Sequence, residues 1–186
     1  MKTGFITDSV SSPVGELHYL VTFEGALKAL SWDLSHVTRV SEALGGSVGG
    51  KNPHNVSDTL TAYFDGELTA IERLATRGDG TEFQRKVWQQ LRAIGAGKTD
   101  TYGAIAARVG SPKASRAVGM ANRSNPVAIV VPCHRVIGKD GTLTGYAGGI
   151  ERKKILLAHE SKYSVNTLTL VPHPKASNSS TSKSKR

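Results

Sequence analysis

The feature that most constrains this chain is the segment that leads to its only cysteine. Five apolar residues, 127–131, precede Pro132, and Cys133 is followed directly by His134 and Arg135. A free thiol has a pKa of about 8.5, so it needs a neighbouring base to act as a nucleophile at neutral pH. We therefore expect the chemistry of this protein at Cys133, with His134 as the nearest base.

Length and cysteine content narrow the class of protein. A chain of 186 residues can form one domain or two small ones. Its first residues lack the apolar core of a secretory signal, and no stretch approaches the roughly 18 apolar residues of a membrane span. One cysteine cannot form an internal disulfide, and cysteine ligands for a zinc site are absent. We expect a cytoplasmic protein with no membrane segment, no metal and no cofactor.

The charge is divided unevenly along the chain. Residues 1–80 carry 6 basic and 10 acidic side chains, whereas residues 81–160 carry 13 basic and 5 acidic ones. An acidic half beside a basic half favours a polyanionic partner for the basic half. A solvated basic surface would give the same count, so charge alone does not identify the partner.

The first 80 residues predict a small α+β domain. Short strands with turn residues between them are expected over residues 3–32, which favours a short antiparallel sheet. The patterning predicts helices over 35–44 and 57–64, and an edge strand over 68–74. Glycines on both sides of Asp79 mark the expected domain boundary.

Residues 81–160 predict a mainly helical second domain. Thr81 and Thr101 are suited to cap two helices, and Ser111-Pro112 is suited to start a third that runs to Ala121. Helix, glycine-containing turn and helix is the outline of a helix-turn-helix. The domain pattern is therefore α+β, with the helix-turn-helix in the second domain.

The C-terminal region predicts one more helix and a polar tail. The last helix is expected at 150–160, with Ile155 and Leu156 turned inward and the basic residues 152–154 turned outward. Residues 161–186 form a tail rich in serine and lysine. Such a composition favours disorder, which we expect from Pro172 onward.

The third helix has the composition of a nucleic-acid contact. Its residues are mostly small, which allows its backbone to approach a partner closely, and cations lie within and beside it. Close packing between helices would explain small residues equally well. The residues concerned are Lys113, Ala114, Ser115, Arg116, Ala117, Gly119, Ala121 and Arg123.

Three interpretations of the cysteine remain open at this point. Cysteine and histidine are the minimum set for a nucleophilic thiol, and a third group should orient the imidazole. Spacing alone leaves Glu151 and Glu160 as candidates, and Asn125 could brace a turn with its amide. A buried structural cysteine and a cysteine hydrolase are the alternatives.

The motifs as a whole resemble those of a known family. Residues 132–138, Pro-Cys-His-Arg-Val-Ile-Gly, preceded by Asn125-Pro126, resemble the active-site signature of the O6-alkylguanine-DNA alkyltransferases (methylated-DNA–protein-cysteine methyltransferases). Further matches are Tyr102-Gly103, Arg116-Ala117-Val118-Gly119, Gly145-Tyr146-Ala147-Gly148-Gly149 and Leu156-Leu157-Ala158-His159-Glu160. The early strands and residues 62–66 look like the bacterial constitutive form, and the resemblance covers about residues 3–160.

The resemblance implies direct-reversal DNA repair by a single-turnover methyltransferase. Such a protein binds alkylated double-stranded DNA in the minor groove and flips out O6-alkylguanine. It then transfers the alkyl group irreversibly to a cysteine, here Cys133. His134 would activate the thiol through water, Glu160 would orient His134, and Asn125 would brace the turn before the cysteine. The sequence leaves O4-alkylthymine open as a second lesion.

The resemblance also implies roles in binding DNA and the base. Tyr102 would press on a backbone phosphate, and Arg116 would replace the extruded base in the stack. The third helix would lie in the minor groove through Ala114, Ser115, Gly119 and Arg123, and the guanine pocket would be lined by Tyr146, Ala147, Gly148 and Val136. No metal is implied, because the zinc-binding cysteines of some relatives are absent, and the protein is expected to act as a monomer. A rival interpretation, a damage sensor that transfers nothing, is disfavoured because such relatives lack the cysteine.

Overall fold

The structure is a computed structural model that describes residues 4–168. The disorder expected from Pro172 onward lies outside the described residues. Within the described range, no helix is long and apolar enough to cross a membrane.

A four-stranded sheet in the order β3-β2-β1-β4 forms the N-terminal part. β1 (Phe5–Val10), β2 (Leu17–Thr22) and β3 (Leu27–Ser31) make an antiparallel meander, and β4 (Val48–Gly49) pairs in parallel with β1. Gly25 closes the second hairpin with φ 91°, a conformation that glycine adopts without strain. The predicted short antiparallel sheet is confirmed, and β4 adds a short parallel strand to it.

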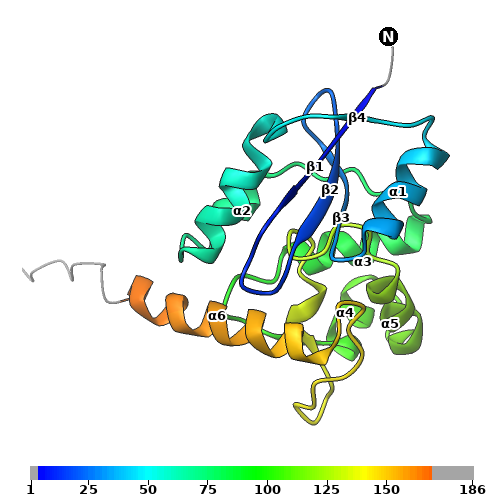
Figure 1. The fold of residues 1–186 in the computed structure, drawn as a ribbon. Coiled ribbons are helices and arrows are strands. Elements are labelled where there is room, and N and C mark those ends of the chain that lie inside the picture. Colours follow the sequence, from blue (N-terminus) through cyan, green and yellow to red (C-terminus); the bar gives the residue numbers. More distant parts are fainter. Residues whose placement is uncertain (1–3, 169–186) are drawn as a thin grey trace, which may run out of the picture.

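Two helices cover the two faces of this sheet (Figure 1). Successive side chains of a strand point to opposite faces, so each face presents its own apolar set. α1 (Leu34–Ala43) covers one face, where Val37 packs in a small cluster with Phe5, Leu20 and Ala29. α2 (Val56–Phe64), which follows the short 3-10 helix η1 (Pro53–Asn55), buries its apolar side in the main core on the other face.

The edge strand expected over 68–74 is wrong. This segment contains the 3-10 helix η2 (Ala70–Arg73), closed by local backbone hydrogen bonds. Leu68, Ile71 and Leu74 are all buried, and their spacing of three residues matches the 3-10 repeat. This three-residue repeat was already present in the sequence. The prediction of a strand was wrong because it overlooked the repeat.

The second part is mainly helical, as predicted. Thr81 forms a capping box with Gln84 at the start of α3, and Thr101 accepts the backbone N–H of Ala104 at the start of α4. α4 and α5 pack together across the glycine-containing turn, which matches the predicted helix-turn-helix outline. The elements are α3 (Glu82–Arg92), β5 (Asp100–Thr101), α4 (Tyr102–Arg108), α5 (Ser115–Arg123), η3 (Cys133–Arg135), β6 (Val136–Ile137) and α6 (Ile150–Leu168).

The start of α5 differs from the prediction. Ser111 does not cap it; the N-cap residue is Ala114, whose backbone N–H donates to the carbonyl of Ser111 at 2.8 Å. Residues 111–114 therefore form a β-turn. Pro112 takes the second position of that turn, which suits its fixed φ as well as the first position of a helix would.

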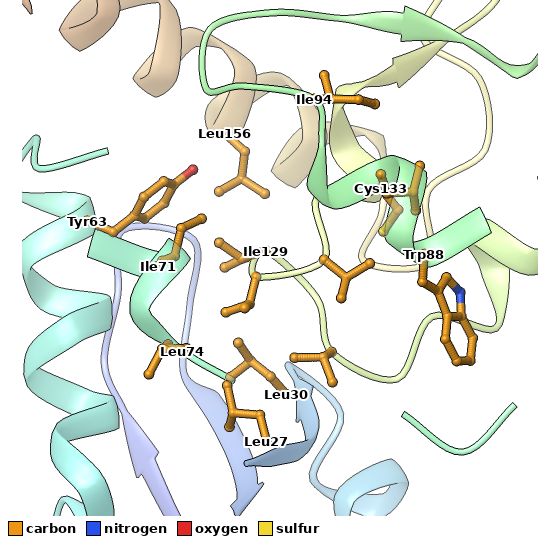
Figure 2. Packing of buried hydrophobic residues seen from close by; sticks show 14 of the residues in the cluster. Leu27, Leu30, Tyr63, Ile71, Leu74, Trp88, Ile94, Ile129, Cys133 and Leu156 are labelled. Atoms are coloured by element: carbon orange, nitrogen blue, oxygen red, sulfur yellow. The ribbon is translucent and has the colours of Figure 1, made fainter. Parts of the chain in front are cut away.

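One hydrophobic cluster runs through both parts of the chain. Figure 2 shows Leu27 and Leu30 of β3 in the same cluster as Ile129, Leu156 and Cys133. Because this core is shared, the sheet supports the cysteine-bearing segment directly. The expected boundary near residue 79 stays a prediction.

The capping box gives a test of the helical part. Thr81→Ala removes the side-chain acceptor at the start of α3, so we expect the free energy of unfolding to fall by about 1 kcal/mol in urea denaturation. Thr69→Ala is the matched control, since Thr69 precedes η2 without a side-chain capping bond. Equal losses in the two variants would contradict the capping role.

Candidate active site

The segment before the cysteine is anchored to the sheet and to the end of α5. The backbone N–H of Leu30 donates to the carbonyl of Pro126, and that of Ala128 donates back to Leu30, both at 2.9 Å. Asn125 joins the two ends of the turn: its Oδ1 accepts from the N–H of Val127 at 3.0 Å. These bonds hold Val127 beside Leu30 of β3 as an isolated parallel bridge, and residues 128–130 form a turn after it.

Asn125 also reaches the thiol. Its Nδ2 donates to the carbonyl of Val131 at 2.8 Å and to Sγ of Cys133 at 3.1 Å. Burial raises the pKa of the Cys133 thiol above its ordinary value, and the hydrogen bond from Asn125 lowers it only in part. The thiol is therefore protonated at neutral pH and needs a base to become a thiolate.

His134 is a neutral base, and one of its two ring nitrogens is already hydrogen-bonded. Its side chain is fully buried, and burial lowers the pKa of the imidazole, an effect that the hydrogen bond to Glu160 offsets only in part. Nε2 lies 3.0 Å from Oε1 of Glu160. Since the carboxylate can only accept, Nε2 carries the hydrogen and Nδ1 has the free lone pair. Nδ1 has no hydrogen-bond partner among the described residues.

Glu160 is the group that orients His134, and Glu151 is not. Glu160 is fully buried and accepts from Tyr63 Oη at 2.8 Å, from the N–H of Gly97 at 3.1 Å and from Arg135 Nη2 at 2.7 Å. Burial alone would raise the pKa of its carboxyl, but hydrogen bonds from His134 and Arg135, with their charge interactions, hold it well below its ordinary value. Glu151 is exposed and pairs with Lys154.

α6 buries Leu156, as predicted, but Lys153 and not Ile155 lies beside it on the inward face. Lys153 is fully buried, whereas Ile155 is 44% exposed. Nζ of Lys153 donates to the carbonyls of Val136 at 2.6 Å and Thr144 at 2.8 Å, so it ties β6 to the following loop. Lys153 shares one helix face with Leu156 and Glu160, three and seven residues further on. A prediction based on hydrophobicity alone places this lysine on the exposed face, so it missed the inward position of Lys153.

A cavity of about 340 Å³ opens beside Cys133. The predicted residues Asn125, Arg123, Tyr146, Ala147 and Gly148 line it. Val136 does not: its side chain is buried in β6. Ala128 lines the cavity as well. The other lining residues, without a predicted role here, are Leu30, Ser31, Trp32, Asp33, His36, Asn122 and Arg152.

A second hollow, of about 820 Å³, lies along α5. Tyr102, Arg116 and Gly119 line it, and it shares Arg123, Tyr146 and Ala147 with the cysteine cavity. Arg116 and Arg123 are exposed. Ala114 and Ser115 stand at the start of α5 and do not line this hollow. α5 and the cysteine cavity are therefore joined by shared walls.

Unpartnered polar atoms gather at this site. Among the described residues, the buried side-chain nitrogens and oxygens without a hydrogen bond are Trp32 Nε1, both amide atoms of Asn122, His134 Nδ1 and Tyr146 Oη. Native proteins leave few such atoms unsatisfied, so their concentration indicates a site for a polar ligand. No set of three or more metal-ligating side chains occurs between residues 4 and 168.

Replacing the central carboxylate tests the network. Glu160→Gln leaves Arg135 buried without its counter-charge, so we expect a loss of about 3 kcal/mol in the free energy of unfolding near pH 7. The depressed pKa of Glu160 makes the stabilisation complete above its unfolded value, about 4.3, and progressively lost below it. Urea denaturation should show the gap from wild type shrinking as the pH falls below about 4.

The exposed Glu151 supplies the matched control for this experiment. Glu151→Gln should leave the free energy of unfolding within error at every pH. A gap between wild type and Glu160→Gln that does not change down to about pH 3 would refute the assignment of a buried carboxylate with a depressed pKa.

Comparison with known proteins agrees with this geometry. The family model described as "6-O-methylguanine DNA methyltransferase, DNA binding domain" matches residues 82–162. A methylated-DNA–protein-cysteine methyltransferase of Salmonella typhimurium is 45% identical over 163 residues, covering 83% of this chain and 95% of that protein. The Mycolicibacterium paratuberculosis protein of the same name is 56% identical over 114 residues, 61% of this chain and 68% of that protein.

Solved structures give the same answer for the fold. The O6-methylguanine methyltransferase of Mycobacterium tuberculosis superposes with a TM-score of 0.74 at 40% identity, covering 90% of this chain and 98% of that one. Its complex with DNA superposes with a TM-score of 0.74 at 41% identity, covering 86% of this chain and 94% of that one. The predicted α+β fold with a helical second part is thereby confirmed. With its cysteine, base and carboxylate in place, the chain belongs to the methylated-DNA–protein-cysteine methyltransferases.

Proposed function

We propose that this chain repairs alkylated double-stranded DNA by moving the alkyl group of O6-alkylguanine onto Sγ of Cys133. The observation that carries the proposal is the environment of the Cys133 thiol. Cys133 faces a ligand-sized cavity, and the neighbouring His134 is a neutral base whose Nε2 is fixed by Glu160. The named relatives are methyltransferases that use a protein cysteine, and one of their structures contains DNA.

The transfer balances with the groups in the site. Nδ1 of His134 takes the thiol proton through one bridging water, and the sulfur becomes a thiolate. The thiolate attacks the alkyl carbon, an S–C bond forms, and the C–O6 bond breaks with its electron pair going to the guanine. The proton held by His134 returns to the base, which leaves as unmodified guanine. The product on the protein is a thioether, so each molecule acts once.

DNA binding falls to α5 in this proposal. Its exposed Arg123 suits a phosphate contact, and its small residues, Ala114, Ser115 and Gly119, suit a close approach to the minor groove. Extruding a base costs roughly a few kcal/mol, which Arg116 in the stack and Tyr102 against the backbone would offset. The base would pass from the hollow along α5 into the cysteine cavity, past the walls that the two share.

The lining of the cavity fits a base better than an apolar ligand. Asn122 offers a buried donor and acceptor, and Tyr146 offers one buried hydroxyl, all without partners in the protein. A purine carries donors and acceptors on several edges, so it can satisfy such groups. Tyr146 and Ala147 form the part of the wall nearest α5 in this assignment, and Gly148 follows them inside the cysteine cavity.

Location and assembly follow from the same chemistry. A thiol that must stay reduced requires a reducing compartment, so we place the protein in the cytoplasm with its DNA. One chain supplies the thiol, the base, the carboxylate and the cavity, so a monomer is sufficient. Residues 81–160 carry the DNA-binding and alkyl-accepting groups, and residues 1–80 complete the cavity.

The mass of the protein tests the transfer. After incubation with a duplex containing O6-methylguanine, intact-mass spectrometry should show the gain of one methylene unit, and peptide mapping should locate it on Cys133. Cys133→Ser should gain nothing. Unmodified protein with tight DNA binding would favour a damage sensor, and repeated turnover without modification would favour a hydrolase. A duplex containing O4-methylthymine, run in parallel, would show whether that lesion is accepted.

The role of Arg116 can be separated from the chemistry. Arg116→Ala removes the side chain assigned to the base stack, so transfer from duplex DNA should slow at least about tenfold. Reaction with the free base O6-benzylguanine should be nearly unchanged, because no base has to be extruded. Arg73→Ala is the matched control, since Arg73 is an exposed arginine that pairs with Glu67 and lines neither hollow. Equal losses on both substrates would contradict the stack-filling role.

A further inference from the structure

We propose that Trp32, the residue directly after β3, limits the size of the alkyl group that Cys133 accepts. The inference rests on the transfer proposed above and adds a specificity-determining residue outside the helical part. It would place the choice of alkyl group at the end of β3, in the N-terminal part that supports the site.

The position of the two cavities leads to this residue. The cysteine cavity shares Arg123, Tyr146 and Ala147 with the hollow along α5, so a base that enters from the DNA arrives on that side. The sulfur must meet the alkyl carbon inside the cavity. The space beyond those shared walls is lined by the end of β3 and the segment after it, including Trp32. A long alkyl group therefore has to lie against these residues.

The indole of Trp32 is held firmly from several directions. The Tyr146 ring meets it edge-on, with centroids 6.0 Å apart and planes at 69°. The guanidinium of Arg152 lies 5.2 Å from its ring centre. Arg152 is itself fixed by the carbonyls of Val14, at 2.8 Å, and Gly148, at 3.0 Å. Trp32 therefore cannot swing aside without disturbing three parts of the chain.

Gly148 closes the remaining side. A Cβ added at this position would lie 2.6 Å from Cζ3 of Trp32, a distance that side chains do not tolerate. The indole ring of Trp32 thus fills the space that a larger side chain at position 148 would occupy. By contrast, Ala128 lines the same cavity with a single methyl group. Trp32 is the bulkiest wall, so it decides how far an alkyl chain can extend.

The magnitude of the effect follows from pocket complementarity. One methylene that fits or fails to fit an apolar pocket changes the rate by about 10- to 200-fold. Shortening Trp32 to alanine should open the cavity to larger groups, and methyl transfer should depend on it much less. The ratio of the two rates is the readout that a purely structural role would not move.

The experiment measures single-turnover transfer from duplexes that carry O6-methylguanine or O6-benzylguanine. We expect Trp32→Ala to raise the benzyl-to-methyl rate ratio at least about tenfold, and Trp32→Phe to raise it by less. Trp32→Phe keeps an aromatic wall, so it gives the answer if the alanine variant does not fold. Leu34→Ala, an exposed apolar residue two positions further on that does not line the cavity, should leave the ratio unchanged.

Other results would overturn the inference. An unchanged ratio in folded Trp32 variants that still transfer methyl groups would mean that Trp32 does not limit alkyl size. A parallel loss of both rates would assign Trp32 to support of the Tyr146 loop alone. A wild-type protein that transfers neither group would instead refute the proposed function, which keeps the two failures apart.

Discussion

The buried carboxylate of Glu160 is the interaction on which the rest of the structure depends. A charge in a protein interior costs several kcal/mol unless it is paired and hydrogen-bonded. Here the donors come from Tyr63 in α2, Gly97 before β5, and His134 and Arg135 in η3. One side chain of α6 therefore links the N-terminal part, the helical part and the cysteine segment. Misplacing any of these elements would leave a buried charge without its partners.

The same carboxylate couples stability to chemistry. Because Glu160 accepts from Nε2 of His134, the proton is fixed on that nitrogen and the lone pair on the other. The bonds that make α6 pack against η3 are thus the bonds that prepare the base. Lys153, two turns earlier on the same face of α6, holds β6 and the loop before Tyr146 in a comparable way. α6 carries no reacting atom, yet it positions both sides of the cysteine.

The sequence predicted well those parts of this arrangement that neighbouring residues form. Thr81 and Thr101 marked two helix starts. The residues around Cys133 predicted a thiol nucleophile with His134 as its base, and the proposed transfer uses both. The errors came where two physical effects use similar residues: Ser111-Pro112 fits a turn as well as a helix start, and residues 68–74 fit a strand until their period of three is counted. Trp32 could not be assigned to the site, because its contacts with Tyr146 and Gly148 join residues more than a hundred positions apart.

A nucleophile that is used once has to stay unreacted until its substrate arrives. Thiol oxidation and unspecific alkylation follow thiolate content and exposure. Cys133 is 6% exposed, and burial raises the pKa of its thiol, so both quantities are low in the free protein. In the proposed transfer, a base that fills the cavity would bring the alkyl carbon to the sulfur, and the lowered pKa of His134 keeps it neutral and able to take the proton. Burial, which looks unfavourable for a nucleophile, is therefore consistent with a cysteine that cannot be regenerated.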